Sequence, residues 1–314
     1  MSTTTERIVT GARRGSPGPR GYGRRRSRSD FRVALLFIAP ALIGLVVFYI
    51  VPTVRGIYLS FTDYSILGEP TWVGGKNYAA LVQDPLFWNS LAVTAEYVII
   101  NIVVQTVIAV GLGLLMNHIA KSTLVRGMLL MPYLVANVIA AMVWFWLLDY
   151  NLGIVNDIIS SLGLPRIAFF GDSFWAIPTQ AIINTWRNMG YTSLLIFAGL
   201  QAIPDTVYEA ARIDGAGPVM TFRKITLPLL RPVLALVLVL TVTGSFQIFD
   251  TVAVTTQGGP VNATRVIQYY IYQVAFGQQE FGYGSAIAVV LFVILGVIAF
   301  AQMKLLRGNQ SDLG

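Results

Sequence analysis

Six long apolar runs constrain the fold of this chain more than any other feature of its sequence. Each holds about 20 residues or more, enough for a helix to cross a hydrocarbon core about 30 Å thick. The composition agrees, because 55% of the residues are hydrophobic and 12% are charged, against about 25% charged in a soluble domain. We therefore expect an all-α, polytopic membrane protein with six transmembrane helices. The expected spans are Val33–Val51, which Pro52 ends, Leu91–Met116, Leu124–Leu148, the more polar Phe174–Leu200, Leu230–Phe249 and Ser285–Leu306.

The basic residues predict which side of the membrane each loop faces. With six crossings both termini lie on one side. The N-terminal tail, the turn near His118, the loop after the fourth run and the C-terminal tail carry nine, two, four and two Lys or Arg residues. The three alternate loops carry two, one and one. By the positive-inside rule, both termini and the loop after the fourth run are cytoplasmic.

Residues 1–32 differ from the rest of the chain. They hold nine arginines together with Gly, Ser and Pro, which predicts a basic, disordered cytoplasmic tail. We interpret the tail as an orientation signal near anionic lipid headgroups and expect no nucleic-acid partner, because no basic or aromatic surface follows it. The apolar run after it is too long for a secretory signal. The predicted organisation is this tail, a transmembrane domain over 33–306 and a short cytoplasmic tail over 307–314.

The loop after the fourth run predicts a helical elbow over residues 204–228. Pro204 and Asp205 favour a helix start, and Gly215 with Gly217 favours a break. Pro218 then opens a second short helix. We expect this second helix to carry Val219, Phe222 and Ile225 on one face, to project Arg223 and Lys224, and to stop at Pro228.

The spacing in this elbow resembles the signature loop of ABC importer permeases: Glu-Ala-Ala, three residues, Gly, nine residues, Ile, any residue, Leu-Pro. The resemblance implies that the elbow is cytoplasmic and that its second arm docks into a cleft on the ATPase subunit. The other interpretation is an amphipathic connector on the membrane surface. The residues assigned to coupling are Glu209, Ala210, Ala211, Gly215, Pro218, Phe222, Arg223, Ile225, Leu227 and Pro228.

Other segments resemble the carbohydrate branch of these permeases, with the resemblance covering about residues 32–306. They include Trp72-Val73-Gly74 with Asn77-Tyr78, Leu130-Met131-Pro132 with Trp144, and Gly258-Gly259-Pro260 with Gly282-Tyr283-Gly284. The resemblance implies the type I ABC importer permease fold in a bacterial cytoplasmic (inner) membrane, with a sugar as substrate. A permease for another solute, such as a polyol or glycerol phosphate, remains an alternative.

Polar residues inside the spans are the candidates for contact with substrate, because they are costly in lipid. Asn184, Arg187, Asn188 and Tyr191 recur at helical spacing in the fourth run. An arginine against lipid would cost about 2.5–3.5 kcal/mol, so this stripe faces a cavity or a partner helix. Two interpretations stay open: substrate lining, or hydrogen bonding that holds the helices together.

Residues of neighbouring spans extend that hypothesis. Gln247 and Asp250, near the end of the fifth run, complete the predicted substrate-lining set, with Asp250 as the counter-charge of Arg187. Trp186 and Phe246 offer faces for a sugar ring. The remaining polar residues of spans two and three are expected to be packing or partner-subunit contacts: Glu96, Asn101, Gln105 and Asn137.

The sequence offers little for catalysis. It has no cysteine, one histidine (His118), scattered acids and no Gly-x-x-x-x-Gly-Lys-Ser/Thr phosphate loop. We predict a non-enzymatic subunit without its own cofactor or metal, with ATP and Mg on a partner. The resemblance implies four partner chains: a second permease, two copies of an ATPase and an extracytoplasmic solute-binding protein. A secondary transporter, the less favoured class, would need an inverted repeat or an ion relay.

Overall fold

The computed structural model describes residues 28–66, 68–118 and 123–307, and the chain forms two compact units whose boundary in the sequence lies between Val54 and Arg55. Most of the predicted N-terminal tail and the predicted C-terminal tail lie outside the described residues.

The first apolar run is helical beyond its predicted end. Helix α1 spans Arg28–Leu45, a π-helical turn η1 spans Val46–Ile50, and α2 spans Val51–Leu59. The expectation that Pro52 ends this helix is therefore wrong. Proline lacks an N–H and its ring collides with the carbonyl four residues earlier in a regular α-helix. The wider turn, in which the Val51 N–H bonds to the Val46 carbonyl, immediately precedes Pro52 and allows the helix to continue.

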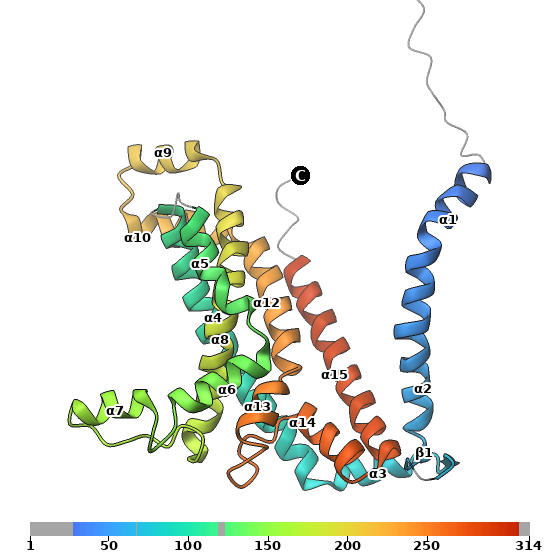
Figure 1. Ribbon diagram of the computed structural model, residues 1–314. Coiled ribbons are helices and arrows are strands. Elements are labelled where there is room, and N and C mark those ends of the chain that lie inside the picture. The colour runs from blue at the N-terminus through green and yellow to red at the C-terminus, as the bar shows by residue number, and fades with distance from the viewer. Residues whose placement is uncertain (1–27, 67, 119–122, 308–314) are drawn as a thin grey trace, which may run out of the picture. The chain divides into compact units, whose positions relative to one another are not determined.

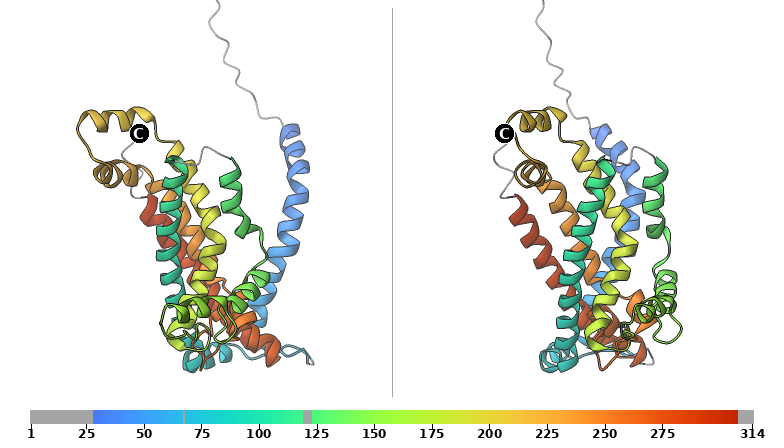
Figure 2. Two further views of the ribbon diagram at one scale, coloured as in Figure 1. Left: turned by 60° about the vertical axis from the view of Figure 1, so that its left-hand side comes forward. Right: turned by 90° about the vertical axis from the view of Figure 1, so that its left-hand side faces the viewer.

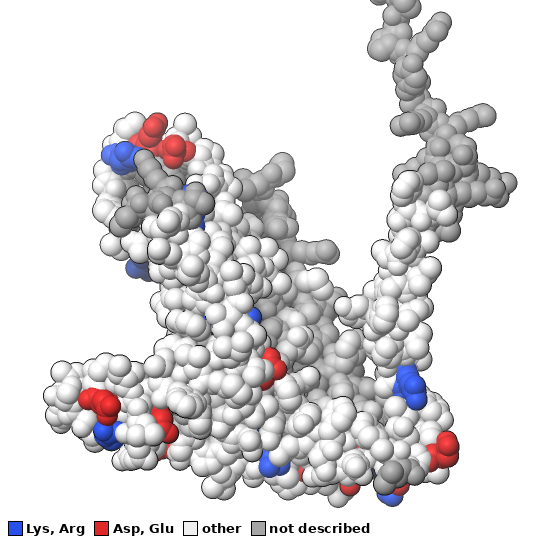
Figure 3. Space-filling model, in the orientation of Figure 1, with Lys and Arg blue, Asp and Glu red and all other residues white. Residues whose placement is uncertain are grey.

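Long helices dominate the second unit, and they run side by side between its two ends (Figures 1 and 2). The largest buried apolar cluster joins four of them and includes Tyr97, Phe246, Ile287 and Leu291. Charged side chains concentrate at the two ends of these helices, with a mostly uncharged surface between them (Figure 3). The long helices are α4 (Pro85–His118), α8 (Ser173–Gln201), α12 (Arg231–Phe246) and α15 (Phe281–Arg307).

Four helices of the described residues are long and apolar enough to cross a membrane: Leu36–Leu59, Pro85–Asn117, Arg231–Thr255 and Phe281–Lys304. A fifth span results if one bent pair is counted together. Helix α8, the predicted fourth span, is not among these four helices. Its polar stripe makes it less apolar than they are.

The bent pair is the predicted third span. It consists of α5 (Thr123–Leu134) and α6 (Asn137–Leu147), which meet at 91°. The expectation of one continuous helix is therefore wrong. Pro132 removes a helical hydrogen bond, and Ala136 adopts an extended conformation that ends the helical path.

The short elements lie at two opposite ends of the second unit (Figure 1). One end carries the elbow. The other carries a two-stranded antiparallel pair, a small departure from the expected all-α fold, and several short helices. The elbow contains α9 (Asp205–Ile213), α10 (Pro218–Thr221), the π-helical turn η2 (Phe222–Thr226) and α11 (Leu227–Leu229). The other end contains β1 (Thr62–Asp63), β2 (Thr71–Trp72), α3 (Lys76–Gln83), α7 (Ile154–Ser161), α13 (Asp250–Thr255), α14 (Ile267–Tyr272) and η3 (Gln273–Gly277).

Candidate functional site

The polar stripe of α8 faces a cavity of ≈ 240 Å³. Asp172 caps the start of this helix by accepting the Phe174 N–H, and the 3.6-residue period then places the four stripe residues on one side. The wall is built from α8, α4, α12 and the first residue of α6. Its lining residues are Asn101, Gln105, Asn137, Asn184, Arg187, Asn188, Tyr191, Thr192, Leu195, Val237, Leu240, Thr241, Gly244 and Ser245.

A hydrogen-bond network joins three helices along this wall. Asn101, fully buried on α4, donates to Ser245 Oγ of α12 at 2.9 Å and accepts from Asn184 Nδ2 of α8 at 2.9 Å. Gln105 Nε2 donates to Thr192 Oγ1 at 2.8 Å. Buried polar groups of this kind are stable where each finds a partner.

Sequence reasoning missed the place of Asn101, Gln105 and Asn137 in the cavity. It predicted packing or partner contacts, and Asn101 and Gln105 do hold helices together, yet all three also line the cavity. The available signal was the four-residue spacing of Asn101 and Gln105, which puts both on one face of α4. Nothing local distinguished that face from one packed against another subunit.

The predicted ion pair between Arg187 and Asp250 is wrong. Arg187 Nε donates to the Val135 carbonyl at 2.9 Å, and its guanidinium lies 5.3 Å from the centre of the Tyr133 ring. Asp250 accepts from Asn137 Nδ2 at 2.9 Å. The break between α5 and α6 explains both partners, because it leaves the Val135 carbonyl outside a helix and sets Asn137 at the start of a new one.

The other residues proposed for sugar contact fall in different places. Gln247 is exposed at the end of α12, and neither it nor Asp250 is among the residues that line the cavity. Phe246 is buried in the apolar core rather than presented to the cavity. Trp186 packs edge-on against Trp144, with ring centres 5.6 Å apart.

Tyr191 is stacked on Tyr133 of α5, with ring centres 4.8 Å apart and an interplanar angle of 12°. Close approach of the two helices depends on Gly190, because a Cβ at that position would collide with the main-chain carbonyl of Leu129. The cavity wall is therefore held by backbone contact as well as by side chains.

The elbow turns at Gly215 as its sequence predicts. Gly215 has φ 76°, the left-handed conformation that glycine adopts without a Cβ penalty. Its N–H bonds to the Arg212 carbonyl at 3.1 Å, and the Ala216 N–H bonds to the Ala211 carbonyl at 2.9 Å. These two bonds form a Schellman motif that ends α9. Pro218 then occupies the first turn of α10, as expected.

The second arm of the elbow departs from the prediction at Pro228. Pro228 does not stop it, because the π-helical turn η2 precedes Pro228 as η1 precedes Pro52, and the helix runs on to Leu229. Val219 is exposed, whereas Phe222 and Ile225 are half-buried, so the three residues differ in exposure.

Exposure divides the predicted coupling residues into two groups. Ala211 is buried, and Phe222, Ile225 and Pro228 are half-buried, so these support the elbow. The exposed residues are Glu209, Ala210, Gly215, Pro218, Arg223 and Leu227. Sequence reasoning missed two exposed apolar side chains beside them, Ile213 and Met220.

Beneath the elbow lies a second cavity, of ≈ 620 Å³, lined by both arms and by the ends of α4 and α8. Tyr208, Arg212 and Phe222 are among its lining residues, and Thr226 Oγ1 donates to Tyr208 Oη at 3.4 Å. The elbow and the ends of α4 and α8 thus form the wall of this second cavity.

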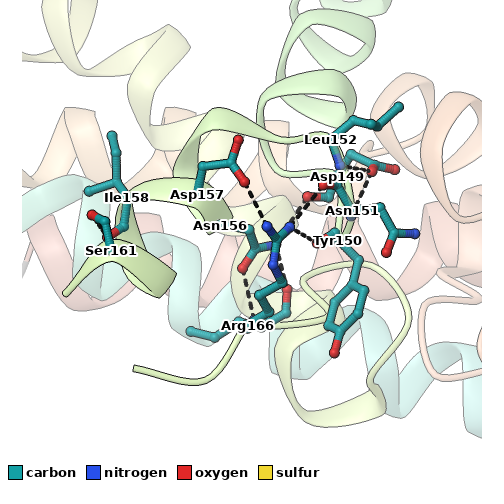
Figure 4. A network of polar contacts seen from close by, with 10 residues as sticks. Asp149, Tyr150, Asn151, Leu152, Asn156, Asp157, Ile158, Ser161 and Arg166 are labelled. Carbon is teal, nitrogen blue, oxygen red and sulfur yellow. Dashed lines mark hydrogen bonds and ion pairs between the residues drawn. The ribbon is translucent and has the colours of Figure 1, made fainter. Parts of the chain in front are cut away.

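At the opposite end, α7 is held by a local polar network (Figure 4). Arg166 forms an ion pair with Asp157 at 2.7 Å and donates to the carbonyls of Tyr150 and Asn151. Asn156, fully buried, bonds to both the Asp149 and Ile167 main chains. These contacts stabilise the loops on either side of α7, and none of these residues lines the cavity.

Asp84, directly before α4, joins three helices at the same end. It accepts hydrogen bonds from Tyr270 of α14, from Tyr283 of α15 at 2.7 Å and from the Leu86 N–H at 2.8 Å. Partial burial raises the pKa of Asp84, but these bonds and that of the Phe87 N–H outweigh burial and hold its pKa below the ordinary value.

Among the described residues, no group of three or more His, Cys, Asp or Glu side chains could hold a metal ion. The residues that line the cavity between α4, α8 and α12, the central cavity, offer hydrogen bonds from amides, hydroxyls and one guanidinium.

Comparison with known proteins identifies the family. Residues 105–309 match the model of the binding-protein-dependent transport system inner membrane component. The chain is 34% identical to the sulfoquinovosyl glycerol transport system permease protein SmoG of Agrobacterium fabrum, over 88% of this chain and 91% of that one. It is 32% identical to the trehalose/maltose transport system permease protein MalF of Thermococcus litoralis, over 88% and 95% of the two chains.

A solved structure shares the fold. A bacterial ABC transporter involved in the import of the acidic polysaccharide alginate contains a chain that matches with a TM-score of 0.78 and 23% identity, over 90% of this chain and 99% of that one. The predicted resemblance to ABC importer permeases is confirmed. The chain belongs to the family of inner membrane components of binding-protein-dependent transport systems, as a non-catalytic permease subunit of an ABC transporter whose ATPase is a separate partner.

Proposed function

We propose that this chain forms half of the translocation pathway of an ATP-driven sugar importer. The observation that carries the proposal is the cavity between α4, α8 and α12, whose wall presents amides and hydroxyls within an otherwise apolar bundle. A sugar carries many hydroxyl groups, and the amides and hydroxyls of the cavity wall can replace water as their hydrogen-bond partners. The names of the relatives, which refer to sulfoquinovosyl glycerol and to trehalose or maltose, support a saccharide as the solute.

In this proposal α8 is a transmembrane span despite its polar stripe, because the stripe faces the pathway rather than lipid. The bent pair α5–α6 is another, so the chain crosses the membrane six times with both termini in the cytoplasm. The distribution of basic residues supports that orientation, which places the elbow in the cytoplasm.

The elbow is the proposed contact with the ATPase. Its exposed face carries Glu209, Arg223 and Leu227, with Ile213 and Val219 as exposed apolar side chains. Exposed apolar groups beside charges suit a contact with another protein. ATP and Mg would bind to the ATPase, and its closure would move the elbow and the long helices together.

The proposed assembly contains a second permease, two ATPase chains and an extracytoplasmic solute-binding protein. The test is uptake of labelled saccharides by proteoliposomes that contain the complete complex with internal ATP. We expect uptake to require both ATP and the binding protein. Uptake driven by an ion gradient without ATP would instead favour a secondary transporter, and failure of an ATPase to copurify would contradict the assembly.

A further inference from the structure

Among the residues that line the central cavity, the only charged side chain is that of Arg187. The others carry amide, hydroxyl or apolar side chains. A guanidinium keeps its charge inside proteins. The cavity therefore has a net positive charge from this chain.

The guanidinium of Arg187 is held in place by contacts that involve only some of its hydrogen-bond donors. Its Nε donates to the Val135 carbonyl at 2.9 Å, and its plane lies near the face of Tyr133, which is itself stacked on Tyr191. Within the described part of the chain, its terminal nitrogens Nη1 and Nη2 make no hydrogen bond. These are the two atoms that bind a carboxylate or phosphate side by side.

No carboxylate of the described residues lies at ion-pair distance from Arg187. Asp250, the acid nearest to the cavity in the sequence-based hypothesis, instead accepts from Asn137. An isolated guanidinium at membrane depth is costly unless an anion or a set of acceptors compensates it. A substrate that carries its own anionic group would compensate it during transport.

We propose that the transported saccharide carries an anionic substituent, a carboxylate, sulfonate or phosphate, and that Arg187 binds it. Asn184 and Asn188, which line the cavity on the same helix, then contact the hydroxyls of the same sugar unit. This inference rests on the proposed function, since it assigns the substrate class of the same cavity.

The test reads occupancy of the cavity without transport. Leu195 lines the cavity, and the chain is naturally free of cysteine. In the complete complex, with cysteine-free partner chains, L195C is labelled with a maleimide in the presence of glucuronate, glucose or inorganic phosphate. We expect glucuronate to protect the thiol at a concentration at least tenfold lower than glucose.

Variants then assign that preference to Arg187. Arg187→Gln should bring the two protective concentrations within twofold of each other, and Arg187→Lys should keep part of the difference. The matched control is Arg166→Gln, which removes an arginine of the outer network and should leave the ratio unchanged. If Arg187→Gln does not assemble, the ratios for the unmodified Arg187 and for Arg187→Lys decide.

Equal protection by glucose and glucuronate would overturn the inference, as would a preference that survives Arg187→Gln. Protection by phosphate as strong as that by glucuronate would overturn its saccharide part. ATP-driven uptake of a neutral sugar with no charge preference would overturn this inference alone. A charge preference in a complex that transports no saccharide would overturn the proposed function and leave the anion site.

Discussion

Arg187 Nε donates a hydrogen bond to the main-chain carbonyl of Val135 at 2.9 Å. This contact joins the middle of α8 to the break between α5 and α6. A break in a helix leaves carbonyls without partners, and a buried carbonyl without a partner is costly. One side chain thus stabilises an irregular backbone segment and presents its remaining donors to the central cavity.

The first prediction concerns the turn of the elbow. Gly215→Ala adds a Cβ that meets no atom within 4 Å, so its cost is conformational, about 1–2 kcal/mol for a left-handed residue. The ratio of correctly placed to misplaced second arms should fall roughly five- to thirtyfold, and ATP-driven uptake should fall with the correctly placed fraction. Gly217→Ala is the matched control, because Gly217 has φ −70° and also meets no atom. Equal uptake by the two variants, normalised to membrane-inserted protein, would contradict the coupling role of the turn.

The second prediction concerns sidedness. In this cysteine-free chain, Ser65→Cys lies in the loop between β1 and β2, and Gly217→Cys lies in the elbow. An impermeant maleimide added to intact cells should label the first and not the second. Ser16→Cys, outside the described residues, should also stay unlabelled. Labelling of Gly217→Cys in intact cells would reverse the proposed orientation.

The third prediction concerns the polar stripe. Asn188 Nδ2 donates to the main-chain and side-chain oxygens of Asn184 at 3.0 Å, and its side chain lines the cavity. Loss of one neutral hydrogen bond to the sugar costs about 0.5–1.5 kcal/mol, so Asn188→Ala should lower uptake at limiting sugar by roughly threefold to tenfold. Asn89→Ala removes an exposed amide outside the cavity and serves as control. Reduced yield of Asn188→Ala with unchanged uptake per complex would mean that the stripe serves packing only.

The fourth prediction concerns the contact of α5 with α8. Gly190→Ala places a methyl group against the Leu129 carbonyl, and overpacking of this kind costs about 1–3 kcal/mol or more. We expect a lower unfolding temperature and a lower yield of the complex in detergent. Gly296→Ala on α15, where a Cβ meets no atom within 4 Å, should leave both unchanged. A Gly190→Ala complex as stable as this control would show that the two helices can separate freely.

The fifth prediction concerns Asp84 and pH. Its pKa is lowered from 3.8 in the folded state, so its stabilisation is present above that value and is lost as the pH falls through the folded-state pKa. Hydrogen bonds to a charged group contribute about 1.5–3 kcal/mol, and Asp84→Asn should lower the free energy of unfolding by about that amount at pH 7. The difference from the unmodified chain should shrink as the pH falls below 3.8.

The control for that measurement is Asp157→Asn, which breaks the exposed ion pair with Arg166. Exposed pairs contribute about 0–1 kcal/mol, so its effect on thermal unfolding should be small. A pH-independent difference between Asp84→Asn and the unmodified chain would mean that the carboxylate charge does not matter there.

Local features of the sequence determined much of this protein. Four of the apolar runs specify long helices that can cross a membrane, because their length and composition suffice for this. Gly215 specifies the turn of the elbow, because glycine adopts the left-handed conformation freely, whereas a residue with a Cβ adopts it only at a cost in energy. The spacing of Asn184, Arg187, Asn188 and Tyr191 specifies a common face, because the helical period is local.

Tertiary structure alone decided how those pieces are used. The π-helical turns let the helices pass Pro52 and Pro228, and the 91° bend divides the third apolar run. Arg187 found its partner in Val135, 52 residues away, and Asn101 joined Asn184, 83 residues away. The helical period of the sequence indicates which face of a helix a residue occupies. Its hydrogen-bond partner depends on which other helix packs against that face. That choice is made by the packing of the whole bundle.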